Sequence, residues 1–337
     1  MLNKSICIVS FNSFSLIRFK KELLIQLKKK YKNVYTLISD PEPDTKNILT
    51  SIGCIPVEIN FSRGNLNLIK NIKEIYLLFK QLKEINPDII LSYYLKPSIL
   101  SVFAAKLANL KRVYIMVEGL GYYFTDLGKI KIKDRFKKKV IQYLLRILIF
   151  SIQVLVNKII VLNKDDKEEL IKKCFINSRK ISIVGGVGIN LKEWEFREVE
   201  SKNISFIYVG RLLFEKGLLE YFEAARIVKN KFPNIIFYIL GDFEESIGSK
   251  LLRNLNLKDD IKTNIIFLGK NNVKFWLSKS SVFVLPSYRE GLPRSSMEAL
   301  ATGRPIITTD VPGCRETIID SWNGFLIKPR NTNSLII

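Results

Sequence analysis

Short apolar runs typical of β-strands alternate with amphipathic runs typical of helices along nearly the whole chain. SICIVSF at 5–11 precedes a helical run at 16–30, and NVYTLIS at 33–39 and CIPVEIN at 54–60 follow it. Strands and helices that alternate in this way build a parallel sheet with helices on both of its faces. The alternation therefore predicts an α/β protein with doubly wound parallel sheets.

The alternation restarts in the second half of the chain. After a charged connector at 189–203, ISFIYVG at 204–210 opens a new series of strand-like runs, continued at 235–242, 265–270, 281–287 and 304–310. A chain of 337 residues is also too long for one ordinary core. We therefore expect two Rossmann-like domains, at residues 1–185 and 190–337. Ligands of such sheets bind beyond the carboxyl ends of the strands, so we look for a site in the loops there.

The amino-acid composition excludes several classes of catalytic site. The sequence contains no histidine, which excludes Ser-His-Asp triads, imidazole acid–base catalysis and histidine-ligated metals. The four cysteines are scattered without the spacing of a metal site and are typical of free thiols in a reducing cytoplasm. The apolar run at the amino terminus is too short for a signal peptide. We therefore expect a cytoplasmic protein.

Positive charge is concentrated in the first half of the chain. Residues 1–163 hold 27 Lys and Arg against 11 Asp and Glu, a balance of +16, and residues 164–337 hold 27 against 21, a balance of +6. The densest run, 129–139, has seven basic residues and one acidic residue. It predicts either a solvated helix face or contact with nucleic acid or an anionic membrane surface. Arg146 and Lys158 interrupt the apolar stretch that follows, so we expect a buried or surface-lying helix there rather than a membrane span.

Two basic residues follow the strand predicted at 204–210. This strand ends at Gly210, and Arg211 and Lys216 lie in the loop before the next helix. Two cations at the carboxyl edge of a parallel sheet favour an anion, above all a phosphate. The alternative is that both side chains are solvated surface charges.

Two glutamates flank a Gly-Leu-Pro turn in YREGLPRSSMEALATG, residues 288–303. Glu290 precedes the predicted helix and Glu298 lies in its second turn. The backbone N–H groups near 292–296 have no partner within the helix and suit a phosphate, and both carboxylates can accept hydrogen bonds from hydroxyls around it. Together with the two basic residues, this loop predicts a nucleotide-sugar site. Glu298 taken alone has the alternative of an exposed helix glutamate.

The motifs VGRLLFEKG, SYREGLPRSSMEALATGRPIITTDVPGCRETI and NGFLI resemble the donor domain of glycosyltransferase family 4, whose fold is GT-B. In the first half, YYLKPSILSVFAAKLANLKRVYIMVEGLGYYF and IIVLNKDDKEEL are similar to members that act on polyprenyl-diphosphate-linked sugars in O-antigen, capsule or glycan assembly. The resemblance covers nearly all residues from 5 to 335. It implies an acceptor-binding domain at 1–185 and a donor-binding domain at 190–337, facing each other across a cleft.

The resemblance also implies a role for each motif residue. Arg211 and Lys216 would hold the donor diphosphate and offset its charge as the sugar leaves. Glu290 would bind sugar hydroxyls, and Glu298 would accept from the ribose hydroxyls of the nucleotide. The pocket around them would be completed by Gly210, by the amides of Gly291 and Leu292, and by Pro293 and Ser295.

The implied enzyme is a retaining hexosyl- or N-acetylhexosaminyltransferase that needs neither a metal nor a cofactor. Its donor is expected to be a UDP-sugar, and its acceptor a polyprenyl-diphosphate-linked saccharide at the inner face of the cytoplasmic membrane. Three alternatives remain. A nucleotide-sugar 2-epimerase is disfavoured by the absence of histidine, and a nucleic-acid binder is supported by charge alone. The third is a catalytically inactive protein that still binds sugar nucleotides.

Three regions depart from the family pattern. Many members carry a histidine in the loop VEGLGYYF, where this sequence has Glu118, which is either its substitute or a loop carboxylate without a catalytic part. The first loop lacks the paired glycines of other members, and Phe11, Tyr122 and Tyr123 are candidates either for the acceptor site or for core packing. The family's last helices do not follow NGFLI, so we expect a chain truncated at its carboxyl end, with looser closure of the two domains.

Overall fold

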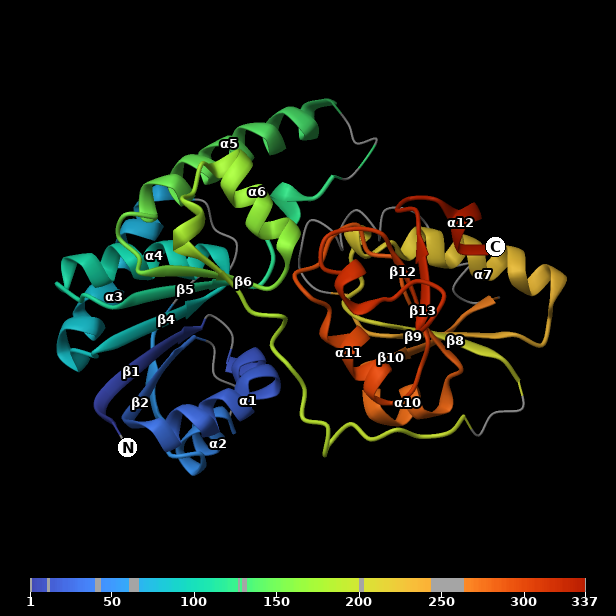
Figure 1. The fold of residues 1–337 in the computed structure, drawn as a ribbon, viewed down its shortest axis with the longest axis horizontal. Coiled ribbons are helices and arrows are strands. Elements are labelled where there is room, and N and C mark those ends of the chain that lie inside the picture. Colours follow the sequence, from blue (N-terminus) through green and yellow to red (C-terminus); the bar gives the residue numbers. More distant parts are fainter. Residues whose placement is uncertain are drawn as a thin grey trace. The chain divides into compact units, whose positions relative to one another are not determined.

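The computed structural model describes residues 2–10, 13–39, 44–60, 67–126, 128, 132–199, 203–243 and 264–336. The chain forms two compact units, each with its own sheet (Figure 1). Unit 1 comprises Met1–Leu120 and Lys138–Val187, and unit 2 comprises Gly121–Lys137 and Gly188–Ile337. Both predicted parallel-sheet domains are therefore present, and the chain finally leaves unit 1 after Val187.

One segment lies in a different unit from the one that the sequence predicted. Gly121–Lys137 groups with unit 2, although the sequence placed it in the first domain. The reason is a set of hydrogen bonds between residues that lie far apart in the sequence. Arg330 donates to the backbone oxygen of Asp126 at 2.6 Å and to its carboxylate at 2.9 Å, and Arg289 donates to the backbone oxygen of Phe124 at 3.3 Å.

The described strands of unit 1 form a seven-stranded parallel sheet in the order β3-β2-β1-β4-β5-β6-β7. The strands are β1 (Leu2–Ser10), β2 (Tyr31–Ile38), β3 (Ile55–Glu58), β4 (Ile89–Tyr93), β5 (Val113–Val117), β6 (Lys158–Val161) and β7 (Ile181–Ile183). The helices are α1 (Ser13–Lys30), α2 (Thr45–Ser51), α3 (Leu68–Ile85), α4 (Leu95–Leu107), α5 (Ile132–Ile152, which begins in the segment grouped with unit 2), α6 (Lys164–Cys174) and the 3-10 turn η2 (Ser178–Lys180). Figure 1 shows α1 and α2 on one face of the sheet and α4, α5 and α6 on the other, which is the doubly wound arrangement.

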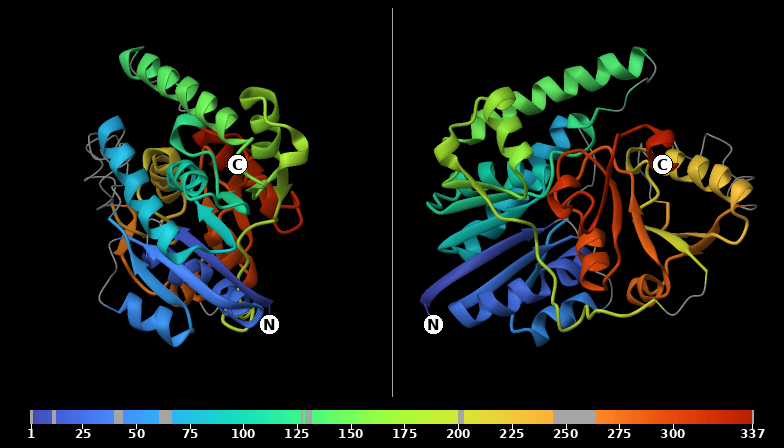
Figure 2. Two further views of the ribbon diagram at one scale, coloured as in Figure 1. Left: turned by 90° about the vertical axis from the view of Figure 1, so that its left-hand side faces the viewer. Right: turned by 45° about the vertical axis from the view of Figure 1, so that its right-hand side comes forward.

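The described strands of unit 2 form a six-stranded parallel sheet in the order β10-β9-β8-β11-β12-β13. The strands are β8 (Ser205–Val209), β9 (Ile236–Leu240), β10 (Ile266–Gly269), β11 (Val282–Leu285), β12 (Ile306–Thr309) and β13 (Gly324–Ile327). The helices are α7 (Leu218–Lys231), α10 (Val273–Lys279), α11 (Arg294–Ala301) and α12 (Thr332–Ile336), with 3-10 turns η1 (Tyr122–Phe124), η3 (Phe214–Lys216) and η4 (Arg315–Thr317). Figure 2 shows α7 and α12 from two further sides.

Apolar side chains at the centres of the strands form the core of each unit. In unit 1, Ile8, Ile90 and Ile159 are completely buried, and in unit 2 Ile207 and Phe283 are as well. These strands are continuous apolar runs because helices cover both faces of a doubly wound sheet. The same runs carried the prediction of parallel strands from the sequence.

Asparagine side chains cap the amino ends of several described helices, among them α3, α6 and α10. Asn67, Asn163 and Asn272 each precede a helix, and each side chain accepts a hydrogen bond from the backbone N–H three residues later, at 3.3, 2.7 and 3.1 Å. Such caps satisfy N–H groups that the first helical turn leaves without a partner. They fix where α3, α6 and α10 start.

In each unit the chain reverses its direction of travel across the sheet once. In unit 1, β1 lies between β2 and β4, and in unit 2 β8 lies between β9 and β11. In doubly wound sheets, the loops after the two strands at such a reversal leave in opposite directions, and ligands bind there, beyond the carboxyl edge. We call these places the unit 1 switch point, between β1 and β4, and the unit 2 switch point, between β8 and β11. None of the helices formed by the described residues is long and apolar enough to cross a membrane.

Candidate active site

The unit 2 switch point brings together the two loops that the sequence singled out. Val282 of β11 pairs with Phe206 of β8, so the two strands run side by side to the same edge of the sheet. The loop after β8 carries Gly210, Arg211 and Lys216. The loop after β11 runs from Pro286 to Pro293 and contains Glu290.

An ion pair joins the two loops. The Lys216 ammonium donates a hydrogen bond to Oε1 of Glu290, and the Ser287 hydroxyl donates to the same oxygen at 2.8 Å. The two charged side chains are only 15% and 13% exposed. No described residue hydrogen-bonds to the other carboxylate oxygen, Oε2. Glu290 is therefore fixed through one oxygen, Oε1.

Backbone contact holds the loops against each other. Gly217 has φ +70°, and a Cβ there would lie 2.0 Å from the backbone oxygen of Pro286. Gly313 has φ +79°, and a Cβ there would lie 2.4 Å from the backbone oxygen of Glu290. Only glycine permits these approaches. The positions of Lys216 and Glu290 are therefore set by the backbone as well as by their ion pair.

A buried tyrosine, Tyr208, lies near Arg211 and Glu290. The Tyr208 hydroxyl donates to the backbone oxygen of Arg211 at 2.8 Å. Burial raises the pKa of Tyr208 well above its usual value, and the charge of Glu290 raises it further, while Arg211 lowers it. The phenol therefore stays protonated and keeps donating to the Arg211 carbonyl, which holds the first residue of this loop in place.

Glu298 lies inside the unit rather than on an exposed helix face. It is 5% exposed, and its Oε1 accepts a hydrogen bond from Nε of Arg294 at 2.8 Å, one helical turn earlier on α11. Pro293 precedes the helix as its N-cap, and Ser296 in the first turn is completely buried. The Ser296 hydroxyl has no hydrogen-bond partner among the described residues. The alternative of an exposed helix glutamate is therefore excluded.

The remaining predicted pocket residues lie around the start of α11. Gly291 and Pro293 are buried, and Leu292 and Ser295 are half-buried. Arg211, in the loop after β8, is exposed. The structure thus gathers every predicted site residue except Glu118 in unit 2, at the carboxyl edge of its sheet and at the adjoining helix start.

Glu118 follows β5, one strand beyond the unit 1 switch point, and forms a second buried ion pair with Lys20 of α1. Its Oε1 accepts from the Lys20 ammonium at 2.6 Å, and the side chains of Lys20 and Glu118 are 3% and 12% exposed. The same ammonium lies over the ring of Tyr93, 4.4 Å from its centre. The hydroxyl of Tyr94 donates to that of Ser15 at 2.9 Å. Burial raises the pKa of Tyr93, and Glu118 adds to the rise.

Sequence reasoning missed Lys20, although a signal for it exists. Leu16, Lys20 and Leu24 are spaced four residues apart in α1, and both leucines are completely buried. That spacing places Lys20 on the apolar face of the helix. A lysine on such a face needs a buried partner, and Glu118 is that partner.

The aromatic candidates for the acceptor site have different positions. Tyr122 and Tyr123 are half-buried in η1 of unit 2, where their rings form an edge-to-face pair with centres 5.5 Å apart. Phe11 lies outside the described residues. A role in acceptor binding stays a prediction for all three.

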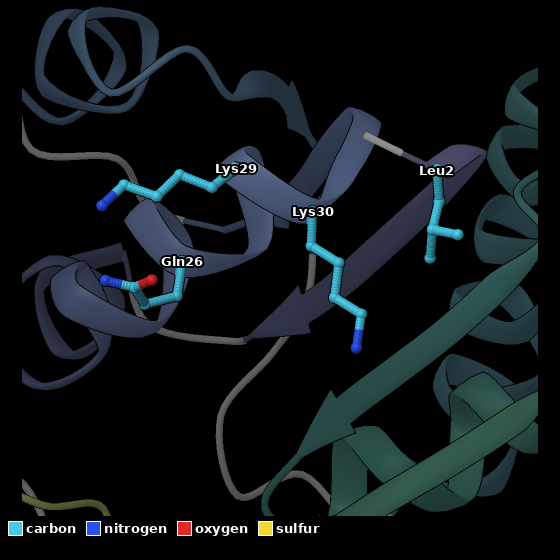
Figure 3. Close-up of a pocket in the computed structure, with 4 residues that line it drawn as sticks. All are labelled: Leu2, Gln26, Lys29 and Lys30. Carbon is cyan, nitrogen blue, oxygen red and sulfur yellow. The ribbon is translucent and has the colours of Figure 1, made fainter.

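A surface hollow of about 540 Å³ lies elsewhere, lined by Leu2, Gln26, Lys29 and Lys30 (Figure 3). Leu2 begins β1, so the hollow lies at the amino edge of the unit 1 sheet, opposite its switch point. Figure 3 shows the side chains of Lys29 and Lys30 pointing apart, so their ammonium groups do not converge on a ligand.

Within the described ranges no three His, Cys, Asp or Glu residues come together as metal ligands would, and the prediction of a metal-independent reaction stays untested.

Two family models divide the chain between them. The model described as glycosyl transferase 4-like matches residues 5–157, and the model described as glycosyl transferases group 1 matches residues 191–336. A UDP-Gal:alpha-D-GlcNAc-diphosphoundecaprenol alpha-1,3-galactosyltransferase of Escherichia coli is 31% identical over 81% of this chain and 70% of its own length. The chain belongs to the group 1, family 4-like glycosyltransferases. The resemblance that the motifs showed is confirmed, and the protein is a transferase.

A second curated relative matches a larger part of this glycosyltransferase chain. It is an N,N'-diacetylbacillosaminyl-diphospho-undecaprenol alpha-1,3-N-acetylgalactosaminyltransferase of Campylobacter jejuni, 28% identical over 95% of this chain and 84% of the relative. A capsular polysaccharide biosynthesis glycosyltransferase of Staphylococcus aureus is 25% identical over 74% of the chain. The Campylobacter relative is named for a diphospho-undecaprenol-linked sugar and the Staphylococcus relative for capsular polysaccharide biosynthesis, in agreement with the resemblance of the motifs.

Solved structures confirm the GT-B fold. A sucrose-phosphate synthase from Thermosynechococcus elongatus matches 99% of the glycosyltransferase chain and 88% of its own with a TM-score of 0.78 and 16% identity. Anabaena Alr3699/HepE in complex with UDP and glucose matches 99% and 88% with a TM-score of 0.73 and 14% identity. At these identities the likeness concerns the fold alone.

Proposed function

We propose that this glycosyltransferase moves a hexose or N-acetylhexosamine from a UDP-sugar to a polyprenyl-diphosphate-linked saccharide and retains the anomeric configuration. The Escherichia coli relative is named for a UDP-sugar donor and a diphosphoundecaprenol-linked acceptor, and the Campylobacter relative for an acceptor of the same kind. The observation that carries the proposal is the Lys216–Glu290 ion pair at the unit 2 switch point. The positive charge of Lys216 suits the diphosphate of a nucleotide sugar, and the carboxylate of Glu290 suits the hydroxyls of its sugar.

The donor diphosphate binds at the cationic side of this site. Lys216 and Arg211 lie on the loop after β8, and the start of α11 adds backbone N–H groups. When the bond from the sugar carbon to the phosphate oxygen breaks, negative charge grows on the diphosphate. Groups already in place around that charge stabilise it without reorganisation, which lowers the barrier.

The sugar and the ribose bind to the two glutamates. Oε1 of Glu290 is held by Lys216 and Ser287, so Oε2 accepts a hydrogen bond from a sugar hydroxyl. Glu298, held by Arg294, accepts from the ribose hydroxyls. Both carboxylates are oriented before the ligand arrives, so less conformational freedom is lost on binding.

We assign acceptor binding to unit 1 and donor binding to unit 2. Beside the unit 1 switch point lies the Lys20–Glu118 pair, whose charges cancel, near tyrosine hydroxyls. A site above this buried, neutral pair would suit the uncharged hydroxyls of an acceptor sugar better than a diphosphate. The excess of positive charge in residues 1–163 supports a position at the anionic inner leaflet, where the lipid-linked acceptor is found.

Release of nucleoside diphosphate from a panel of nucleotide sugars tests this function. The purified chain is assayed with and without a polyprenyl-diphosphate-linked saccharide, and NMR of the product determines the anomeric configuration. We expect release from a UDP-hexose or UDP-N-acetylhexosamine that depends on the acceptor, and a product of unchanged configuration. Binding of the donor without any acceptor-dependent release would favour the inactive sugar-nucleotide binder instead.

A further inference from the structure

Helix α5 carries apolar side chains on two opposite sides. Ile149 and Ile152 are 2% and 0% exposed and face the interior of unit 1. The opposite side is apolar as well but lies in solvent. Its residues and their exposed fractions are Phe136 72%, Val140 44%, Tyr143 64%, Ile147 44% and Phe150 50%. We call these five residues the α5 seam.

The spacing of the seam places it along one line of the helix. Successive members are separated by four, three, four and three residues, and an α-helix turns by about 100° per residue, so all five side chains project in nearly the same direction. Leu144 and Leu148, 53% and 39% exposed, widen the line at one edge. Exposed apolar side chains gathered along one line of a helix mark an interaction site.

The charged side chains of α5 that the structure describes, from Arg135 onward, are all basic. Arg135, Lys137 and Lys139 are exposed beside its first turns, and Arg146 is half-buried farther along. From Arg135 to Lys164 the sequence contains no Asp or Glu. In Figures 1 and 2 no described helix or strand of unit 1 covers the outer side of α5. Along the described part of α5, from Arg135 to Ile152, the seam is therefore an apolar line whose charged neighbours on the helix are cationic.

We propose that α5 lies in the surface of an anionic lipid bilayer, with the seam among the acyl chains and the basic residues at the headgroups. A helix with an apolar face and Lys or Arg at its borders binds a membrane in this way. A second copy of the chain is the other occupant that an apolar line could have. It would bring the same basic borders together, where paired helices place opposite charges. Charge complementarity therefore selects the anionic lipid.

The inference rests on the proposed position at the membrane and names the element responsible for it. It makes no use of the residues at either switch point. Membrane binding and sugar transfer can therefore be measured separately. Transfer is measured on a water-soluble diphosphate acceptor with a short prenyl chain, and membrane binding on vesicles without any acceptor.

The first test is co-sedimentation of the full chain with vesicles. One set contains equal parts of phosphatidylglycerol and phosphatidylcholine, and the other contains phosphatidylcholine alone. Tyr143→Ser/Ile147→Ser/Phe150→Ser removes the centre of the seam at exposed positions. Trp322→Ser in unit 2, where the indole is 78% exposed, removes a comparable apolar surface elsewhere. The thermal midpoint of each variant confirms that it is folded.

We expect the wild type and Trp322→Ser to bind the anionic vesicles equally, and the triple variant to bind at least about tenfold more weakly. Binding to neutral vesicles should be weak for all three. Equal binding by the triple variant and the wild type would overturn the inference, and so would absence of binding by the wild type. A dimer in solution that the triple variant converts to a monomer would identify a second copy as the occupant. Transfer to the soluble acceptor should be unchanged in the triple variant. Its absence in every chain, with vesicle binding intact, would count against the proposed function alone.

A second test places the seam in the bilayer directly. Cys7, Cys54, Cys174 and Cys314 are all buried, so a cysteine introduced on the surface can be labelled selectively. A polarity-sensitive fluorophore on Phe150→Cys should shift to the blue on addition of anionic vesicles, because it moves from water into the lipid. The same label on Trp322→Cys should not shift. Equal shifts at both positions, or none at Phe150→Cys, would contradict insertion of the seam.

Discussion

The two units each hold a lysine–glutamate pair at or beside their switch point, and the surroundings of the two pairs differ. In unit 2, Lys216 and Glu290 form an ion pair, and the Ser287 hydroxyl donates to Glu290. Arg211 supplies a second cation on the same loop as Lys216, and α11 starts after the loop of Glu290. Lys20 and Glu118 of unit 1 lie deeper, and tyrosine rings cover the ammonium. The pair in unit 2 therefore lies near a second cation and a helix start, whereas the ammonium of the pair in unit 1 lies against aromatic rings. We therefore propose that one switch point binds an anion and the other binds hydroxyl groups.

The largest effect should follow from loss of either member of the unit 2 pair. We expect Lys216→Ala and Glu290→Ala each to lower kcat/KM for transfer by more than about tenfold and up to about 1,000-fold, because preorganised charge at a transition state is lost. Lys231→Ala is the matched control, since this lysine ends α7 at the opposite edge of the sheet. Steady-state kinetics of the three variants check the prediction. Unchanged turnover in both site variants would remove the site assignment.

Next in size is the backbone contact that holds the unit 2 loops together. Gly217→Ala should lower stability by about 2–5 kcal/mol, from the cost of positive φ and from overlap with the Pro286 oxygen. Gly188→Ala shares the positive φ, +71°, but nothing lies within 4 Å of the new methyl group. It should cost only about 1–2 kcal/mol. Urea denaturation of both variants separates the two contributions, and equal losses would mean that the contact is unimportant.

A smaller effect is expected at the unit 1 pair, and it should concern the acceptor. Lys20→Met leaves Glu118 buried without a cation and should cost about 3 kcal/mol of stability. The double variant Lys20→Met/Glu118→Gln should recover part of that loss, because no isolated charge remains. Kinetics of Glu118→Gln should show a higher KM for the acceptor and an unchanged KM for the donor. A change in the donor KM alone would reverse the assignment of the units.

The smallest effect concerns a carboxyl group beside the unit 2 pair. Burial raises the pKa of Glu220 above 4.5, although the hydrogen bond from Tyr288 opposes the rise. The folded state therefore holds this proton more tightly than the unfolded chain, so the contribution to stability is present at low pH and is lost as pH rises through the folded pKa. Glu220→Gln should flatten the decline of stability above about pH 4.5 by less than about 1 kcal/mol. Denaturation curves between pH 4 and 7 measure it, and identical slopes in both chains would contradict it.

The parts of this molecule that depend on short stretches of sequence could be predicted. Buried parallel strands are continuous apolar runs, and Arg211, Lys216 and Glu290 follow directly after such runs. The ion pair between Arg294 and Glu298 has the spacing of one helical turn, so it could also be predicted from the sequence. β13 was not predicted as a strand, because its four residues begin with glycine and lack a long apolar run.

What the sequence could not reveal depends on contacts between distant residues. Arg330 and Asp126 lie 204 positions apart, and their hydrogen bonds group Gly121–Lys137 with unit 2. Lys20 and Glu118 are 98 positions apart, and only the three-dimensional fold shows that one neutralises the other. Propensity and periodicity describe neighbours along the chain, so neither contact could be derived from them.

Binding of UDP to three chains tests the central claim most directly, namely that unit 2 binds the donor nucleotide and the unit 1 pair does not. Isothermal titration calorimetry gives the Kd of UDP for the wild type, Lys216→Ala and Lys20→Met, each first shown to be folded. We expect Lys216→Ala to bind at least about tenfold more weakly, because a cation beside the diphosphate is lost, and Lys20→Met to bind like the wild type. Equal Kd values for Lys216→Ala and the wild type, or weaker binding by Lys20→Met alone, would contradict the account.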